Sequence, residues 1–136
     1  MDEFAISEVM RRNAQEAADL AWLRIQTHLD FSESRVEQLE MILAEIYGGF
    51  PKGLLLGLLS QSTSLGEVWH QSEIWGAYLG EVIGRRWGGG WALDQTMYAG
   101  AQPKLVVLGR DLFLVADAHN RLTNGRGPMW ASITRL

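Results

Sequence analysis

The chain has 136 residues, no cysteine and a formal net charge of −4. This length suits one domain, and the lack of cysteine excludes disulfides and thiolate metal sites. The first twelve residues are acidic and lack the basic and apolar segments of a secretory signal. The longest purely apolar run, residues 53–59, is far shorter than the roughly 20 residues needed to cross a bilayer. We therefore expect a soluble cytoplasmic protein that does not bind membranes.

The charge is distributed unevenly along the chain. Residues 1–50 hold ten acidic residues against four arginines, whereas residues 51–136 hold six acidic residues against eight basic ones. An acidic front half repels a phosphate backbone and attracts a basic protein, so the distribution argues against nucleic-acid binding. The same acids also fit the solvated faces of two amphipathic helices, with no further role.

Two amphipathic helices are predicted in the acidic front half. Apolar residues recur at helical spacing from Ser7 to Leu29. Ser34 and Glu37 then form a capping box before a second helix, which ends at Gly48. We expect these helices to form an antiparallel pair. The segment that follows, residues 51–63, fits either a short buried helical turn or a packed loop.

A central helix is predicted over residues 64–88, because a capping box precedes an apolar face at helical spacing. Three glycines recur every four residues beside that face: Gly76, Gly80 and Gly84. Each glycine costs up to about 1 kcal/mol relative to alanine in a helix, so we expect another element to press against this stripe. Ile74 and Tyr78 lie on the polar face of this helix. Glu81 and Arg85 lie on the same face and could form an ion pair. Either the first helix or residues 54–59 cover Ile74 and Tyr78, or these two residues form a binding surface.

The glycines at 88–90 follow the central helix. Anion-binding loops place their glycines before a helix, where backbone amides and the positive end of the dipole face the phosphate. Here Arg85 and Arg86 complement the negative end of the dipole. We therefore interpret the run as a helix stop with a left-handed glycine, and not as a nucleotide cradle.

Strand periodicity follows the helix stop. Trp91, Leu93 and Met97 alternate along one segment, and residues 105–108 and 112–116 are typical of a β-hairpin. The run DAHNRLTNG fits turns or a short helix, and the last eight residues fit a brief helix or strand.

This layout predicts one α+β domain over residues 1–136. A helical hairpin occupies residues 1–50, and a central Gly-rich helix over residues 64–88 packs on a small antiparallel meander. The meander and the tail occupy residues 91–136.

Signals for catalysis or metal binding are weak. Glu67, His70 and Glu73 share one helix, but a carboxylate di-metal site needs a second Glu-x-x-His pair, which this sequence lacks. Asp117 and His119 are candidates for acid–base catalysis, but adjacent strands or turns often place such residues close together without any catalytic role. The sequence also contains no nucleophile elbow, Walker loop or zinc spacing. We predict no catalytic residue, no cofactor and no metal.

A motif within residues 64–130 joins a YLGE helix core, a Gly-Trp stop and an Arg-Leu-x-Asn-Gly turn. Its residues are Tyr78, Leu79, Gly80, Glu81, Gly88, Trp91, Arg121, Leu122, Asn124 and Gly125. The motif resembles a group of small bacterial domains of largely unassigned function. Proteins of this kind resemble immunity proteins encoded beside secreted antibacterial toxins. The resemblance implies a protein that neutralises a cognate toxin by occluding its active site, without catalysis of its own.

A basic cleft in such a toxin would attract acids of the first two helices as phosphate mimics. The candidate partner-binding residues are Asp30, Glu33, Glu37, Glu40 and, as an aromatic anchor, Trp130. A tryptophan in the tail also fits a residue folded over the core. We expect a monomer or a weak homodimer. The alternative is a small enzyme or ligand-binding domain with a pocket between the central helix and the sheet, near Glu81, His119 or Arg121.

Overall fold

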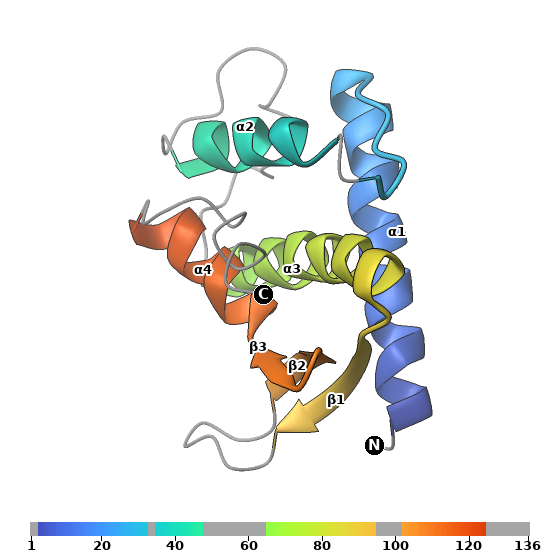
Figure 1. Cartoon of the computed structure of the whole chain (residues 1–136). Helices are drawn as coiled ribbons and strands as arrows, with labels where there is room; N and C mark the ends of the chain where they lie inside the picture. The colour runs from blue at the N-terminus through green and yellow to red at the C-terminus, as the bar shows by residue number, and fades with distance from the viewer. Residues whose placement is uncertain (1–2, 33–34, 48–64, 95–101, 125–136) are drawn as a thin grey trace.

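The computed structural model describes residues 3–32, 35–47, 65–94 and 102–124 of the chain. These residues form an α+β fold with a small antiparallel sheet, as the sequence predicts (Figure 1). The elements are α1 (Glu3–Ile25), α2 (Val36–Tyr47), α3 (Leu65–Trp87), β1 (Gly90–Asp94), β2 (Gln102–Val107), β3 (Arg110–Leu112) and α4 (Leu114–Asn124). None of the helices within these ranges combines the length and apolar character required to span a membrane.

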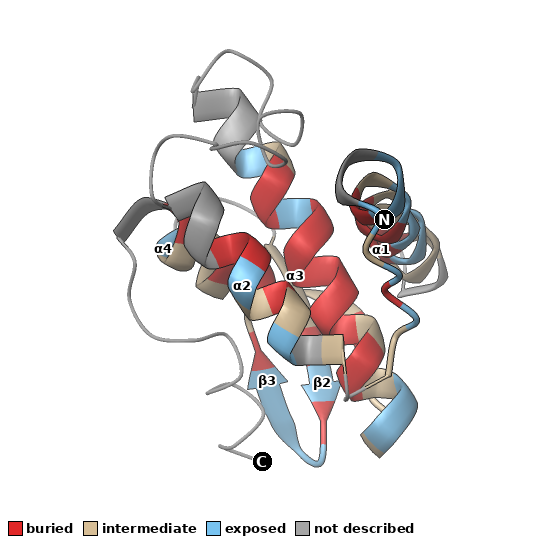
Figure 2. Cartoon of the chain, turned by 90° about the horizontal axis from the view of Figure 1, so that it is seen from above, coloured by how far each residue is buried: buried red, intermediate tan, exposed pale blue. Residues whose placement is uncertain are grey.

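Helix α3 lies at the centre of the fold. Helices α1 and α4 pack directly against it, and α2 packs on α4. Seen from above, α3 is buried along most of its length, with α1 on one side and α4 on the other (Figure 2). Its fully buried apolar side chains within the described residues are Ile74, Trp75, Ala77, Tyr78, Leu79, Val82 and Ile83. The predicted central helix is therefore the element on which the others are assembled.

The predicted close approach to the glycine stripe of α3 is confirmed. A Cβ atom on Gly76 would lie 2.8 Å from the carbonyl oxygen of Leu114, at the start of α4. On Gly80 it would lie 2.1 Å from Cζ2 of Trp91 in β1. Both distances are shorter than real Cβ contacts, so these two positions require glycine for packing.

The helix stop is confirmed as well. Gly88 follows the last residue of α3 with φ of +81°, the left-handed conformation that glycine adopts without strain. Its backbone N–H donates to the carbonyl oxygen of Gly84 at 2.7 Å. The chain then turns directly into β1, which brings Trp91 back onto α3.

The sheet has the strand order β1-β2-β3, and both pairings are antiparallel. Trp91 is paired with Leu105, and Leu105 is paired in turn with Leu112. All three side chains are buried, so they form a row on the inner face of the sheet. On the outer side, the Lys104 ammonium bonds the carboxylate of Asp111 at 2.9 Å.

The predicted second strand of the hairpin, residues 112–116, is wrong beyond its first residue. Leu108 and Gly109 both have positive φ, of 52° and 75°, which makes a tight two-residue turn and lets β3 begin at Arg110. The chain is helical from Leu114 onward. The helical face that is buried consists of Leu114, Val115, Ala118 and Leu122. The undecided run DAHNRLTNG is thus helical as far as Asn124.

The predicted antiparallel pairing of the first two helices is also wrong. Helix α1 packs on α3 and β1, whereas α2 packs on α4. In Figure 1 the two helices run in different directions, α1 along one side of the molecule and α2 across its top. Helix α1 ends at Ile25, because Gln26 has φ of 52°. The loop that follows contacts α3 through Phe31.

Candidate functional site

Three of the five predicted partner-binding residues lie in the described part of the chain, at the connection between α1 and α2. Asp30 is exposed in the loop, and Glu37 is exposed in the first turn of α2. Glu40 is half-buried and already interacts with another group of the chain. Glu33 and Trp130 lie outside the described residues.

The carboxylate of Asp30 is held in place by its own loop. It accepts hydrogen bonds from the hydroxyl of Ser32 and, at 3.0 Å, from the backbone N–H of Ser32. These two bonds, together with the charge of Arg35, lower the pKa of Asp30 below its usual value. Asp30 therefore presents a fixed negative charge at the protein surface.

The loop that carries Asp30 is anchored to α3 through Phe31. The backbone N–H of Phe31 donates to Oη of Tyr78 at 2.9 Å. The two rings stack with their centroids 4.8 Å apart, and the guanidinium of Arg85 lies 4.3 Å from the centroid of the Phe31 ring. Phe31 has φ of 67°, which is uncommon for a residue other than glycine. These contacts fix a backbone conformation that the loop alone would not favour.

This anchor also explains how Tyr78 is covered. Phe31 stacks on its ring and α1 packs along α3, so Ile74 and Tyr78 are fully buried and form no binding surface. The pKa of Tyr78 is raised, chiefly because burial penalises the phenolate. Arg85 lies over Phe31 rather than against Glu81, so the predicted Glu81–Arg85 ion pair does not form.

Large apolar side chains are exposed beside the same connection. Trp22 is 54% exposed and Leu23 is 69% exposed, both in the last turn of α1. The ring of Trp22 meets His28 of the loop edge-on, with centroids 6.3 Å apart. On α2, Met41 is exposed one helical turn after Glu37, on the same side of the helix. Exposed apolar side chains thus lie close to the exposed acidic residues of this connection.

Trp22 was not predicted as a contact residue. The buried residues of α1 include Ile6, Met10, Ala14, Ala17, Ala18 and Ala21. Trp22 lies about 100° around the helix from Ala21 and about 40° beyond Ala18, at the margin of this buried stripe. An exposed tryptophan is the type of side chain that can anchor a protein interface.

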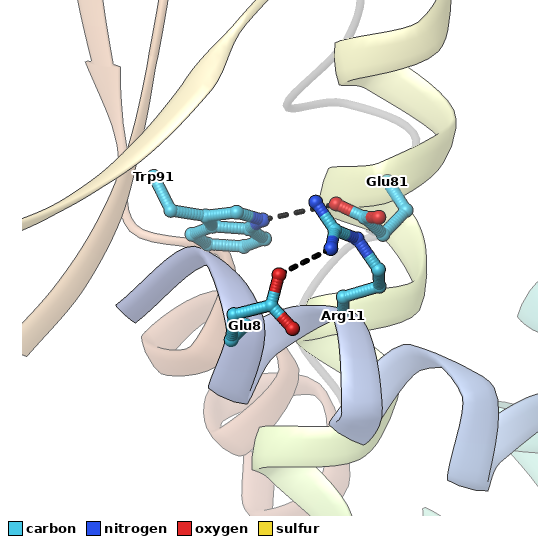
Figure 3. Close-up of polar contacts among 4 residues, drawn as sticks. All are labelled: Glu8, Arg11, Glu81 and Trp91. Carbon is cyan, nitrogen blue, oxygen red and sulfur yellow. Dashed lines mark hydrogen bonds and ion pairs between the residues drawn. The ribbon is translucent and has the colours of Figure 1, made fainter. Parts of the chain in front are cut away.

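Two of the residues named for the alternative pocket function, Glu81 and His119, do not come together. Nε1–H of Trp91 donates to Oε2 of Glu81 at 3.1 Å, and Figure 3 shows Glu8 and Arg11 of α1 beside this contact. His119 instead stacks on Trp69, with ring centroids 3.8 Å apart. Trp69 and Glu81 are twelve residues apart on α3, about 18 Å along its axis. Glu81 therefore fastens β1 to α3 and is remote from His119.

His70 of α3 contacts α1 rather than a second acid on its own helix. Its Nε2 lies 2.6 Å from Oε2 of Glu16. Within the described residues, no group of three histidine or carboxylate side chains is placed to hold a metal ion. The side chain of Glu67, the third residue of the candidate metal set, lies outside the described residues.

Comparison with known proteins finds no relative. No protein-family model, curated protein or solved structure matches this chain.

Proposed function

We propose that the protein binds and neutralises a basic bacterial toxin through the connection between α1 and α2. The contact residues, here called the junction surface, are Trp22, Leu23, Asp30, Glu37 and Met41, all of them exposed. The observation that carries the proposal is the anchoring of Phe31 on Tyr78. That contact gives a charged surface loop one defined conformation.

A fixed loop favours binding because less conformational entropy is lost when the partner docks. The charges of Asp30 and Glu37 steer a basic cleft toward the surface, which raises the association rate and disfavours acidic partners. Trp22 supplies the type of side chain that dominates binding energy in protein interfaces. The resemblance of the YLGE and Arg-Leu-x-Asn-Gly segments to immunity proteins supports a toxin as the partner.

The test pairs the protein with the product of the gene adjacent to its own. The proposal requires the adjacent gene to encode a secreted toxin. A metabolic operon at that position would contradict it. Cells that express the toxin and the double variant Asp30→Lys/Glu37→Lys should die, whereas cells with the unaltered protein survive. The Kd for the toxin should rise at least tenfold, about 1.4 kcal/mol, and binding by the unaltered protein should weaken with salt.

The control is Glu73→Lys, a single charge reversal at an exposed position on α3, away from the junction surface. It should protect cells as well as the unaltered protein does. Trp22→Ala should also weaken binding, mainly through faster dissociation. If the double reversal protects cells fully while its circular dichroism spectrum is unchanged, the junction surface is not the binding site.

A further inference from the structure

A pocket lies where α1, α3, β2 and α4 meet. Its volume is about 380 Å³, within the range of small-molecule sites. Apolar side chains of α1 and α4 form much of its wall, among them the buried Met10 and Val115. Polar groups are contributed by Asn13 of α1, Glu73 of α3 and Gln102 of β2. Such a pocket can enclose an apolar body and meet a polar group at the same time.

Glu73 is the only charged side chain among the described residues that line the pocket. It is exposed, and it forms no hydrogen bond or ion pair in the described part of the chain. Other acids nearby are occupied: Glu81 accepts a bond from Trp91, and Glu16 contacts His70. The Glu73 carboxylate is therefore available to a ligand, and it repels anions.

Trp69 lines the pocket one helical turn before Glu73 and on the same side of α3. Its side chain is 39% exposed, which is unusual for so large an aromatic residue. The ring of His119 stacks on it with an interplanar angle of 16°, and this stack holds the indole in a defined orientation. Burial lowers the pKa of His119, so its ring adds no positive charge to this wall at neutral pH.

We propose that this pocket binds a small organic cation, an ammonium group attached to an apolar body. Glu73 is the counter-ion, the indole of Trp69 contacts the cation through its π face, and Met10 with Val115 surrounds the apolar part. A carboxylate beside an aromatic ring favours ammonium over both anions and neutral polar molecules.

This site is separate from the junction surface. Asn13 at the pocket and Trp22 at the junction are nine residues apart on α1, about 14 Å along its axis. The inference therefore does not depend on the proposed toxin binding, and either can fail alone.

The test uses three probes that share one apolar body: 4-phenylbutylamine, 4-phenylbutanol and 4-phenylbutyrate. Binding is followed by chemical-shift changes in ¹H–¹⁵N NMR spectra through the millimolar range, including the indole N–H of Trp69. The amine should bind about fivefold or more tightly than the alcohol, and the acid should bind most weakly. The largest shifts should fall on residues of α1, α3, β2 and α4 that line the pocket.

Glu73→Gln keeps the size of the side chain and removes its charge. It should weaken amine binding about fivefold and leave alcohol binding unchanged. The matched control is Glu37→Gln, the same replacement at an exposed position of α2, which should leave both affinities unchanged. Equal binding of amine and alcohol, unaltered amine binding by Glu73→Gln, tighter binding of the acid, or no binding of any probe would each overturn the proposal.

Discussion

Replacing Gly80 by alanine should destabilise the fold, although alanine is the better helix former. The added methyl group would lie 2.1 Å from Cζ2 and 2.4 Å from Cη2 of Trp91. The indole has little room to retreat, because Trp91 is buried and its Nε1–H is bonded to Glu81. Ordinary contact needs a separation of 3.4 Å or more, so the ring has to move by more than 1 Å.

The size of the effect follows from three contributions. Overpacking a filled core costs about 1–3 kcal/mol. Loss of the Trp91–Glu81 hydrogen bond costs a further 0.5–1.5 kcal/mol or so. The helix propensity of alanine returns about 1 kcal/mol. We therefore expect Gly80→Ala to lower the free energy of unfolding by about 0.5–3.5 kcal/mol, as measured by urea denaturation with circular dichroism.

Gly84→Ala is the matched control on the same helix. A Cβ there would lie 3.3 Å from the single carbonyl oxygen of Gly89, in the turn before β1, which needs to shift by only a few tenths of an ångström. Its stability should equal or exceed that of the unaltered protein. In a Trp91→Leu background, Gly80→Ala should change from destabilising to neutral or stabilising, because the obstructing ring is gone. If Gly80→Ala costs the same in both backgrounds, the indole contact is not its cause.

Two further predictions concern the loop anchor and the wall of the pocket. Tyr78→Phe removes the acceptor for the Phe31 N–H, so it should cost about 1–2 kcal/mol in urea denaturation and raise amide exchange at Phe31. An unchanged exchange rate would refute the anchor. Burial lowers the pKa of His119, so the unfolded state binds a proton on this ring more readily than the folded state does. The contribution of the neutral ring to the free energy of unfolding is therefore fully present above pH 6.5, and it is lost as pH falls through the folded-state pKa. His119→Gln should therefore reduce the drop in urea midpoint between about pH 8 and about pH 5, and an equal drop in both proteins would contradict this cause.

The sequence predicts the fold well where the cause is local. Glycine at a left-handed position ended α3 at Gly88, and the spacing of Gly76 and Gly80 required a close neighbour. The identity of each neighbour was not predictable, because the backbone of Leu114 and the ring of Trp91 reach α3 only through the tertiary fold. The apolar face of α2 likewise shows that the helix is buried on one side but does not specify α4 as its partner.

The predicted second strand of the hairpin failed after Leu112 because its local pattern also fits a helix. Leu112 and Leu114 are both buried, and this alternation suits a strand. The same Leu114 also begins a helical face with Val115 and Ala118. In the fold, the backbone of Leu114 and Val115 at the start of α4 packs against Gly76, a tertiary contact that no local pattern indicates.

The candidate site was predictable in its charge but not in its construction. Charge counting named Asp30 and Glu37, and both are exposed, while their role in binding stays a prediction. The contact that orders their loop joins Phe31 to Tyr78 across 47 residues, and no local pattern indicates it. The pocket draws residues from four elements, which only the assembled fold brings together.

Both proposed sites depend on α3, but at different points along it. Tyr78 and Arg85 hold the loop beneath the junction surface, whereas Trp69 and Glu73 line the pocket nearer the N-terminus of the helix. Glu73 precedes Tyr78 by about one and a half turns. Gly80 contacts Trp91 and belongs to neither site. Gly80→Ala should therefore reduce the fraction of folded protein without changing the affinity of the folded molecules for toxin or amine. Altered affinity in this variant would mean that the packing of β1 on α3 shapes one of the sites.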